Sequence, residues 1–272
     1  MRFLILSLLL FVSTFIYAGG PWLQPHKKGY VQTQFTLPIG YYNRIFLEDG
    51  SDLQLNNNVL DVHWQNYTEY GLLKKTNLLL DIPFKYVEAN NYYFSKHLLG
   101  FSNVAIGIKQ QLTNKNWLSS ISFTWNFNTI SKKLAYGLST GYNDNLFLLN
   151  YSIGRGWAKT YFYTEIIGVK ALKRYSDSWK INIELGKKIR NKHWLAITIN
   201  SLQSFKNKSF NDNRLKQTAL YPNNQEYLAY GVKFIYSLKD DKKGLTFATY
   251  GALAGNYVAH LATLNAGYFW KF

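Results

Sequence analysis

The last twelve residues, "LATLNAGYFWKF" (261–272), have the two-residue period of a β-strand and not the period of a helix. One face of this strand is apolar and aromatic: Leu264, Ala266, Tyr268, Trp270 and Phe272. The other face is mostly small or polar: Thr263, Asn265, Gly267, Phe269 and Lys271. The chain therefore ends on a strand with one apolar face.

The same alternation recurs along the chain, most clearly in "SWKINIELGKK" (178–188), where Lys180, Asn182 and Glu184 oppose apolar neighbours. A strand with this pattern cannot be buried on both faces. Antiparallel strands with one apolar face build either a soluble sandwich or a barrel that turns that face to lipid. The segments are about 10 residues long, which is the length that spans a bilayer, whereas globular strands average about 5 or 6. The barrel is therefore the favoured interpretation.

Composition agrees with an exported barrel. Mean hydropathy is −0.21, which excludes a bundle of membrane-spanning helices. Residues 1–18 have one Arg, an apolar core and a small residue at the end, as in a secretory signal peptide, with an uncleaved anchor helix as the alternative. The chain has no cysteine, so a disulfide-stapled secreted domain is excluded. The net charge of +16 suits anionic lipids or solutes, or reflects a compositional bias.

We predict an all-β fold, a transmembrane antiparallel β-barrel of about 12 strands with periplasmic termini. The expected domains are a signal peptide (1–18) and an outer-membrane barrel (19–272). The expected strands are 28–39, 61–72, 76–87, 102–112, 117–128, 145–155, 159–169, 178–188, 193–204, 226–238, 244–255 and 261–272. We expect long outer loops at 40–60, 88–101, 129–144 and 205–225, and periplasmic turns near Lys74, Asn114, Asn191 and Asp240.

Aromatic residues lie near the ends of these segments, where membrane barrels place interfacial girdles. The residues concerned are Tyr30, Trp117, Tyr161, Trp179, Trp194, Tyr227 and Trp270. Phe272, Trp270 and Tyr268 are expected to form the assembly signal that the barrel-assembly machinery recognises. Pro83 lacks an amide donor, so it predicts a bulge or kink in the wall, which could also open a lateral exit.

Four stretches resemble known outer-membrane barrels: "WLQPHKKGYVQTQF" (22–35), "TEYGLLKKTNLLLDIPF" (68–84), "GFSNVAIGIKQQL" (100–112) and "GVKALKRYSDSWKINIELGKK" (168–188). The first three are similar to the channel family associated with meta-pathway phenol degradation. The fourth is similar to exopolysaccharide-linked barrels of unknown role. Asn103 stands where that channel family typically has Asp. The resemblance implies a relationship to the long-chain fatty-acid transporter superfamily, whose members pass hydrophobic molecules.

No catalytic constellation is visible in the sequence. The five histidines, His26, His63, His97, His193 and His260, do not lie two residues before a serine or directly after an aspartate, as serine-hydrolase or Asp–His barrels would suggest. No spacing suggests a zinc site, and no glycine-rich phosphate loop is present. We predict a non-enzyme without cofactor or metal, and a barrel hydrolase is the weakest alternative.

The polar faces provide candidate lumen-lining residues: Asp81, Lys85, Lys109, Lys180, Glu184 and Lys233. Two interpretations stay open. In an open lumen the lysines would concentrate anions. In a plugged lumen Lys85 or Lys180 would pair with Asp81 or Glu184 across strands.

The predicted function is a passive channel or transporter for a small hydrophobic or amphipathic compound. The alternative is a nontransporting envelope or adhesive barrel. Expected partners are outer-membrane lipid and lipopolysaccharide, the barrel-assembly machinery and a small hydrophobic or anionic solute, and not nucleic acid. Asn56–Asn58 and Lys206–Lys208 are predicted to lie outside the cell, and Asp240–Lys243 on the periplasmic side.

Overall fold

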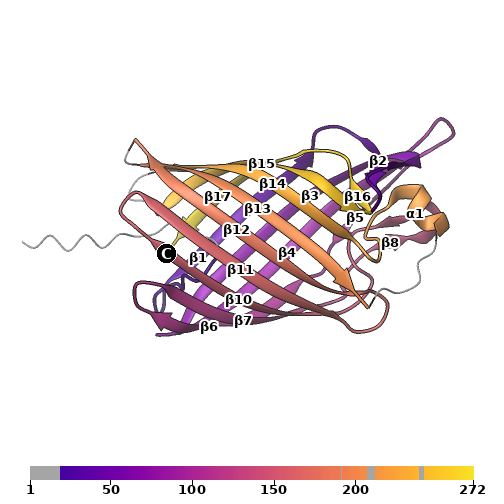
Figure 1. Cartoon of the computed structure of the whole chain (residues 1–272). Coiled ribbons are helices and arrows are strands. Elements are labelled where there is room, and N and C mark those ends of the chain that lie inside the picture. Colours follow the sequence, from indigo (N-terminus) through magenta and orange to yellow (C-terminus); the bar gives the residue numbers. More distant parts are fainter. Residues whose placement is uncertain (1–18, 191, 207–211, 239–241) are drawn as a thin grey trace, which may run out of the picture.

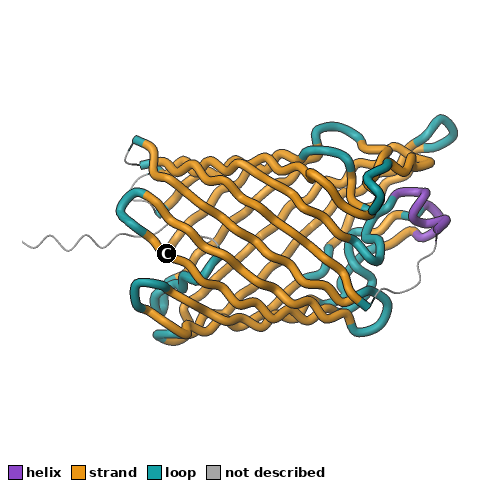
Figure 2. The backbone as a smooth tube through the Cα atoms, viewed as in Figure 1, coloured by secondary structure: helices purple, strands orange, loops and turns teal. Residues whose placement is uncertain are grey.

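The chain folds into one closed antiparallel β-barrel, seen in the computed structural model in Figures 1 and 2. The structure describes residues 19–190, 192–206, 212–238 and 242–272, so the predicted signal peptide lies outside the described residues. The wall strands are β1 (Gly29–Pro38), β3 (Asp52–Leu73), β4 (Thr76–Asn90), β6 (Ala105–Asn114), β7 (Leu118–Asn126), β10 (Leu146–Gly156), β11 (Thr160–Ala171), β12 (Asp177–Ile189), β13 (His193–Phe205), β14 (Glu226–Ser237), β15 (Lys243–Asn256) and β17 (Thr263–Lys271). The predicted count of 12 is confirmed.

The seam of the barrel joins the first wall strand to the last. β1 pairs with β17 on one side, with Val31 opposite Trp270, and with β3 on the other. Beyond the strands, the backbone of Gly29 exchanges two hydrogen bonds with that of Phe272, at 2.8 and 3.0 Å. The terminal aromatic strand therefore closes the ring, and every wall strand has a neighbour on both sides.

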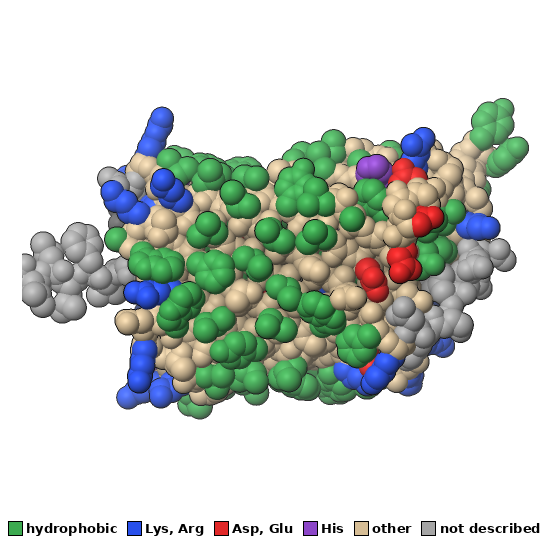
Figure 3. Space-filling view, viewed as in Figure 1, with side chains coloured by type: hydrophobic (Ala, Val, Ile, Leu, Met, Phe, Trp, Pro, Cys, Tyr) green, Lys and Arg blue, Asp and Glu red, His purple; other side chains and the backbone are tan. Residues whose placement is uncertain are grey.

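The outer surface carries the apolar face of each strand, which forms a band between two charged ends (Figure 3). Its large side chains are exposed, as at Phe35 (47%), Ile197 (58%) and Leu264 (50%). A soluble protein does not expose a continuous apolar surface of this extent, whereas an outer-membrane barrel places such a band in lipid. No helix in the described part of the chain is long and apolar enough to span a membrane.

The two ends of the barrel differ. Short turns join β3 to β4, β6 to β7 and β10 to β11 at the end where β17 stops, which we call the turn end (Figure 2). Longer segments join strands at the opposite loop end. These contain β2 (Tyr42–Phe46), β5 (Ser95–Phe101), β8 (Lys132–Lys133), the 3-10 helix η1 (Leu134–Tyr136), β9 (Leu138–Ser139), α1 (Asp212–Thr218) and β16 (Val258–Ala259).

Two of the predicted outer loops are wrong in part, because strands extend into them. β2 and the beginning of β3 occupy much of 40–60, and β4 continues to Asn90, where it forms a hairpin with β5. These extensions alternate polar and apolar residues less regularly than the membrane-spanning parts. Their pairing depends on neighbouring segments such as β16, which pairs with β2.

The bulge predicted at Pro83 is present in the wall. Below it, β4 pairs with β6 up to Asp81, opposite Ala105, and above it β4 pairs with β5 from Phe84, opposite Phe101. The Pro83 carbonyl accepts a hydrogen bond from the Ser102 amide at 2.9 Å. Proline cannot donate to the ladder, so the irregular residues 102–104 separate β5 from β6 at this position.

The predicted aromatic girdle is wrong for four of its members, which face inward. Tyr30 (2% exposed), Tyr161 (0%) and Trp194 (5%) are buried, and Tyr227 lines a luminal cavity. Trp117 (41%) and Trp270 (45%) face outward as expected. Position near a strand end does not determine the face, because the side chain follows the parity of its own strand.

Candidate functional site: the barrel lumen

The turn end of the lumen is closed by the segment 19–24, which precedes the first wall strand. Pro21 and Trp22 are buried, and the Trp22 ring packs edge-on against Tyr163, with ring centroids 5.6 Å apart. Trp22 belongs to a buried cluster with Tyr30, Tyr161, Tyr163, Trp194, Ala196, Ile235 and Phe269. We call segment 19–24 and this cluster the turn-end plug.

Polar contacts attach the plug to the wall. Lys109 donates a hydrogen bond from Nζ to the Trp22 carbonyl at 2.7 Å. The Gly20 amide donates to Glu165 Oε1 at 3.0 Å, and just after the segment the Lys27 amide donates to the Gly71 carbonyl at 2.8 Å. The segment is therefore fixed by both backbone and side-chain groups.

A second apolar cluster covers the loop end. It contains Tyr42, Ile45, Leu55, Val59, Val87, Ala89, Leu98, Leu138, Leu215, Ala219 and Leu220. Hydrogen bonds hold the segment around α1 over it: Asn57 Nδ2 donates to the Gln217 carbonyl at 2.9 Å, and Thr218 Oγ1 donates to the Gly137 carbonyl at 2.8 Å.

Asn103 fixes the connection between β7 and β10. It is 7% exposed, and its Nδ2 lies 3.2, 2.8 and 3.2 Å from the carbonyls of Phe127, Tyr142 and Asp144. Its Oδ1 accepts from the Tyr142 amide at 2.8 Å. An aspartate could accept from that amide but could not donate to the three carbonyls. Asn103, which stands where the similar channel family typically has Asp, therefore has a structural role in this protein.

Asn103→Asp is expected to loosen this connection and to lower the free energy of unfolding by about 1–3 kcal/mol, because buried carbonyls lose their donor. The measurement is the rate of trypsin cleavage at Lys132 and Lys133 in the folded barrel, together with urea unfolding. Asn128→Asp is the matched control, since Asn128 makes exposed contacts to the same connection. Equal cleavage rates in the wild type and Asn103→Asp would contradict the assigned role.

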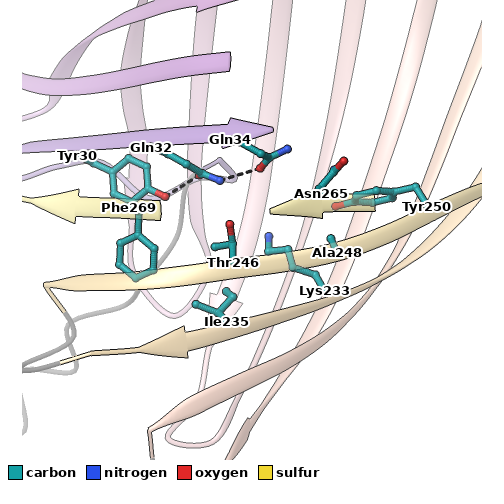
Figure 4. Close-up of a pocket in the computed structure, with 10 residues that line it drawn as sticks. All are labelled: Tyr30, Gln32, Gln34, Lys233, Ile235, Thr246, Ala248, Tyr250, Asn265 and Phe269. Atoms are coloured by element: carbon teal, nitrogen blue, oxygen red, sulfur yellow. Dashed lines mark hydrogen bonds between the residues drawn. The ribbon is translucent and has the colours of Figure 1, made fainter. Parts of the chain in front are cut away.

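Between the turn-end plug and the loop-end cluster lies a chamber of about 680 Å³. Six tyrosines line it, Tyr42, Tyr142, Tyr221, Tyr227, Tyr250 and Tyr257, together with small apolar residues such as Ala229 and Ala252. Its charged groups include Asp61, Lys85 and Lys180. Smaller cavities of about 290 and 140 Å³ lie on the lining that includes Gln32 and Gln34. Figure 4 shows the smaller of these, with Lys233 and Tyr250 on its wall.

The structure places the six predicted lumen residues on the inner face, and most of the charges are neutralised there. Lys85 pairs with Asp61 at 2.8 Å, Lys109 with Glu69 at 3.4 Å and Lys233 with Glu184 at 2.9 Å. Asp81 accepts a hydrogen bond from Gln65 at 2.8 Å. Lys180 lines the chamber, and no ion pair or hydrogen bond joins it to any described residue.

The pairs differ from those considered in the sequence, where Lys85 or Lys180 was matched with Asp81 or Glu184. The partners Asp61 and Glu69 were missed. Glu69 is 1% exposed and also accepts from Asn77 Nδ2 at 2.7 Å. The alternation that places Glu69 on the inner face was visible in the sequence, but its position opposite Lys109, two strands away, was not.

Segment 19–24 was also missed as part of the lumen. The available signal was the pair Pro21 and Trp22, between the predicted signal peptide and the first strand. A solvent-exposed tail at this position would not require a large aromatic residue.

The described residues contain no group of three His, Cys, Asp or Glu side chains that could hold a metal ion.

Comparison with known proteins gives a likeness of fold. No family model matches the chain, and no curated protein matches it by sequence. The structure is similar to that of the COG4313 outer membrane channel from Pseudomonas putida F1, with a TM-score of 0.75 and 12% identity over 95% of this chain and 100% of that one. It is also similar to the CymD monoaromatic hydrocarbon channel, with a TM-score of 0.52 and 10% identity over 92% and 89% of the two chains. The chain therefore has the outer-membrane barrel fold that its motifs suggested.

Proposed function

We propose that this protein is a passive outer-membrane channel for small hydrophobic or amphipathic compounds. The observation that carries the proposal is the chamber of about 680 Å³ inside a closed barrel. Small-molecule sites are typically concave, about 300–1,000 Å³ in volume, and largely apolar with a few polar groups. Tyrosine rings offer such a lining because each has an apolar face and one hydroxyl.

The fold supports the proposal. A barrel of 12 strands is intermediate in width between small filled barrels and open porins, so it can enclose a single small solute. Of the two similar structures, one is an outer membrane channel and the other a monoaromatic hydrocarbon channel.

We infer that the protein is not an enzyme. We also infer that it moves its solute down a concentration gradient, since the sequence carries no motif for energy coupling.

Location and orientation are part of the same proposal. Residues 1–18 would be removed on export, the turn end would face the periplasm, and Phe272, Trp270 and Tyr268 would be read by the barrel-assembly machinery. Positions 207–208 and 240–241, which were included in the predicted orientation, lie outside the described residues. Figure 3 shows Lys and Arg side chains at the edge of the turn end.

A nontransporting surface barrel is the second candidate. It is favoured by Tyr92 and Tyr93 at the tip of the β4–β5 hairpin, which are 96% and 88% exposed. Exposed aromatic pairs are common in binding surfaces. This candidate predicts that the chamber has no role in transport.

Uptake of radiolabelled 4-phenylbutanol by intact cells distinguishes the two. Cells with the folded protein in the outer membrane are expected to take up the probe several-fold faster than cells without it. Ala229→Trp should reduce the gain, because Ala229 lines the chamber and the indole would occupy part of it. Ala266→Trp, on the exposed face of β17, is the matched control and should leave uptake unchanged. Equal uptake with and without the protein would favour the surface barrel.

A further inference from the structure

Lys180 differs from the other predicted luminal lysines in having no carboxylate partner among the residues that the structure describes. Lys85, Lys109 and Lys233 are each within 3.4 Å of a carboxylate oxygen. Around Lys180, the residues directly opposite on the neighbouring strands are Ile167 and Leu202, which carry no charge. Its ammonium group therefore adds one unneutralised positive charge to the chamber.

The nearest acid on an adjacent strand is already engaged. Glu165 lies opposite Asn182, one inward position along from Lys180. Its Oε2 accepts from Asn182 Nδ2 at 3.2 Å, and its Oε1 accepts from the Gly20 amide and Ser152 Oγ at 3.0 and 3.1 Å. Glu165 lines the cavity of about 290 Å³ and not the chamber. It contacts the plug at Gly20.

The surroundings of Lys180 are aromatic and polar without being acidic. Tyr142 and Gln225 line both the chamber and a smaller cavity that Lys180 also borders. Tyr142 donates its hydroxyl to Gln225 Oε1 at 3.2 Å. In the chamber, the only described carboxylate on the lining is Asp61, and Lys85 holds both of its oxygens at 2.8 and 3.0 Å.

We propose that the chamber binds small aromatic carboxylates, with the carboxylate on the Lys180 ammonium and the ring against the tyrosines. A charge in a partly desolvated site attracts an opposite charge more strongly than it would in water, and a hydrogen bond to a charged group is stronger than one between neutral groups. The tyrosine faces provide the apolar contact. This inference rests on the proposed function and specifies the class of solute.

The test uses three probes and the full-length protein in detergent micelles, with binding measured by calorimetry against a protein-free blank. Benzoate has both the ring and the charge, benzyl alcohol has the ring alone, and acetate has the charge alone. For the wild type we expect benzoate to bind at least tenfold more tightly than either of the others. Lys180→Gln should weaken benzoate binding by about tenfold or more, because one charge-assisted hydrogen bond is lost, and leave benzyl alcohol binding unchanged.

Two variants complete the design. Lys187→Gln removes the same charge from the exposed face of the same strand and should not alter benzoate binding. Lys180→Arg keeps the charge and should retain binding within a few-fold. Folding of each variant is checked by heat-modifiable migration on gels.

Benzoate binding no tighter than that of benzyl alcohol, or unchanged in Lys180→Gln, would overturn the inference. Loss in Lys187→Gln equal to that in Lys180→Gln would also overturn it, since it would reflect net charge and not this site. Failure here leaves the uptake result for 4-phenylbutanol intact, whereas absence of uptake with preserved benzoate binding would reject the channel and keep the site.

Discussion

Deletion of residues 20–24 is expected to raise single-channel conductance in planar bilayers by about tenfold or more, because an apolar constriction blocks water and ions until it is removed. In the wild type, Trp22 fills the turn end against Tyr161 and Tyr163. The deletion keeps Pro25 to Lys28, whose backbone is bonded to Gly71, so the barrel seam is left intact. The wild type should conduct little.

Trp22→Ala is the smaller form of the same change and should give an intermediate conductance. Trp117→Ala is its matched control, since Trp117 is 41% exposed on the outer surface. An unchanged conductance in a folded deletion variant would place the barrier at the loop end, in the cluster that includes Leu215 and Leu220. That result would show that the turn-end plug does not limit conductance.

Lys233→Met is expected to lower the free energy of unfolding by about 3–5 kcal/mol, because it leaves a buried carboxylate without its cation. Glu184 is 4% exposed and accepts two hydrogen bonds from Lys233 Nζ, at 3.0 and 2.9 Å, and one from the Tyr161 hydroxyl at 2.6 Å. Lys233 lies on the wall of the small cavity in Figure 4. Urea unfolding in phospholipid vesicles measures the change.

The double variant Lys233→Met with Glu184→Gln should recover most of the lost stability, since no buried charge then remains unpaired. Lys187→Met removes an exposed lysine on β12 and should change stability by less than about 0.5 kcal/mol. Lys233→Met would be no more destabilising than Lys187→Met only if another group neutralised the Glu184 carboxylate. That result would contradict a stabilising role for the Lys233–Glu184 ion pair.

The sequence by itself determined the barrel, its strand number and the face of most side chains. These properties follow from a two-residue period that each strand carries locally, so "SWKINIELGKK" places Lys180, Asn182 and Glu184 inward without reference to any other strand. The strand count followed from the alternation of turns and loops. The bulge at Pro83 followed from a missing amide donor.

The tertiary structure alone decided which charges meet and what fills the lumen. Lys109 reaches Glu69 across β4, and Lys233 reaches Glu184 across β13. These contacts depend on the stagger and curvature of the closed wall, which no local period encodes. Trp22 enters the lumen because inward-facing Tyr30, Tyr161 and Trp194 form an aromatic socket there, and those residues come from strands far apart in the chain. Among the described residues Lys180 has no ion-pair partner, because the acid on the adjacent strand β11, Glu165, is bound to Gly20, Ser152 and Asn182.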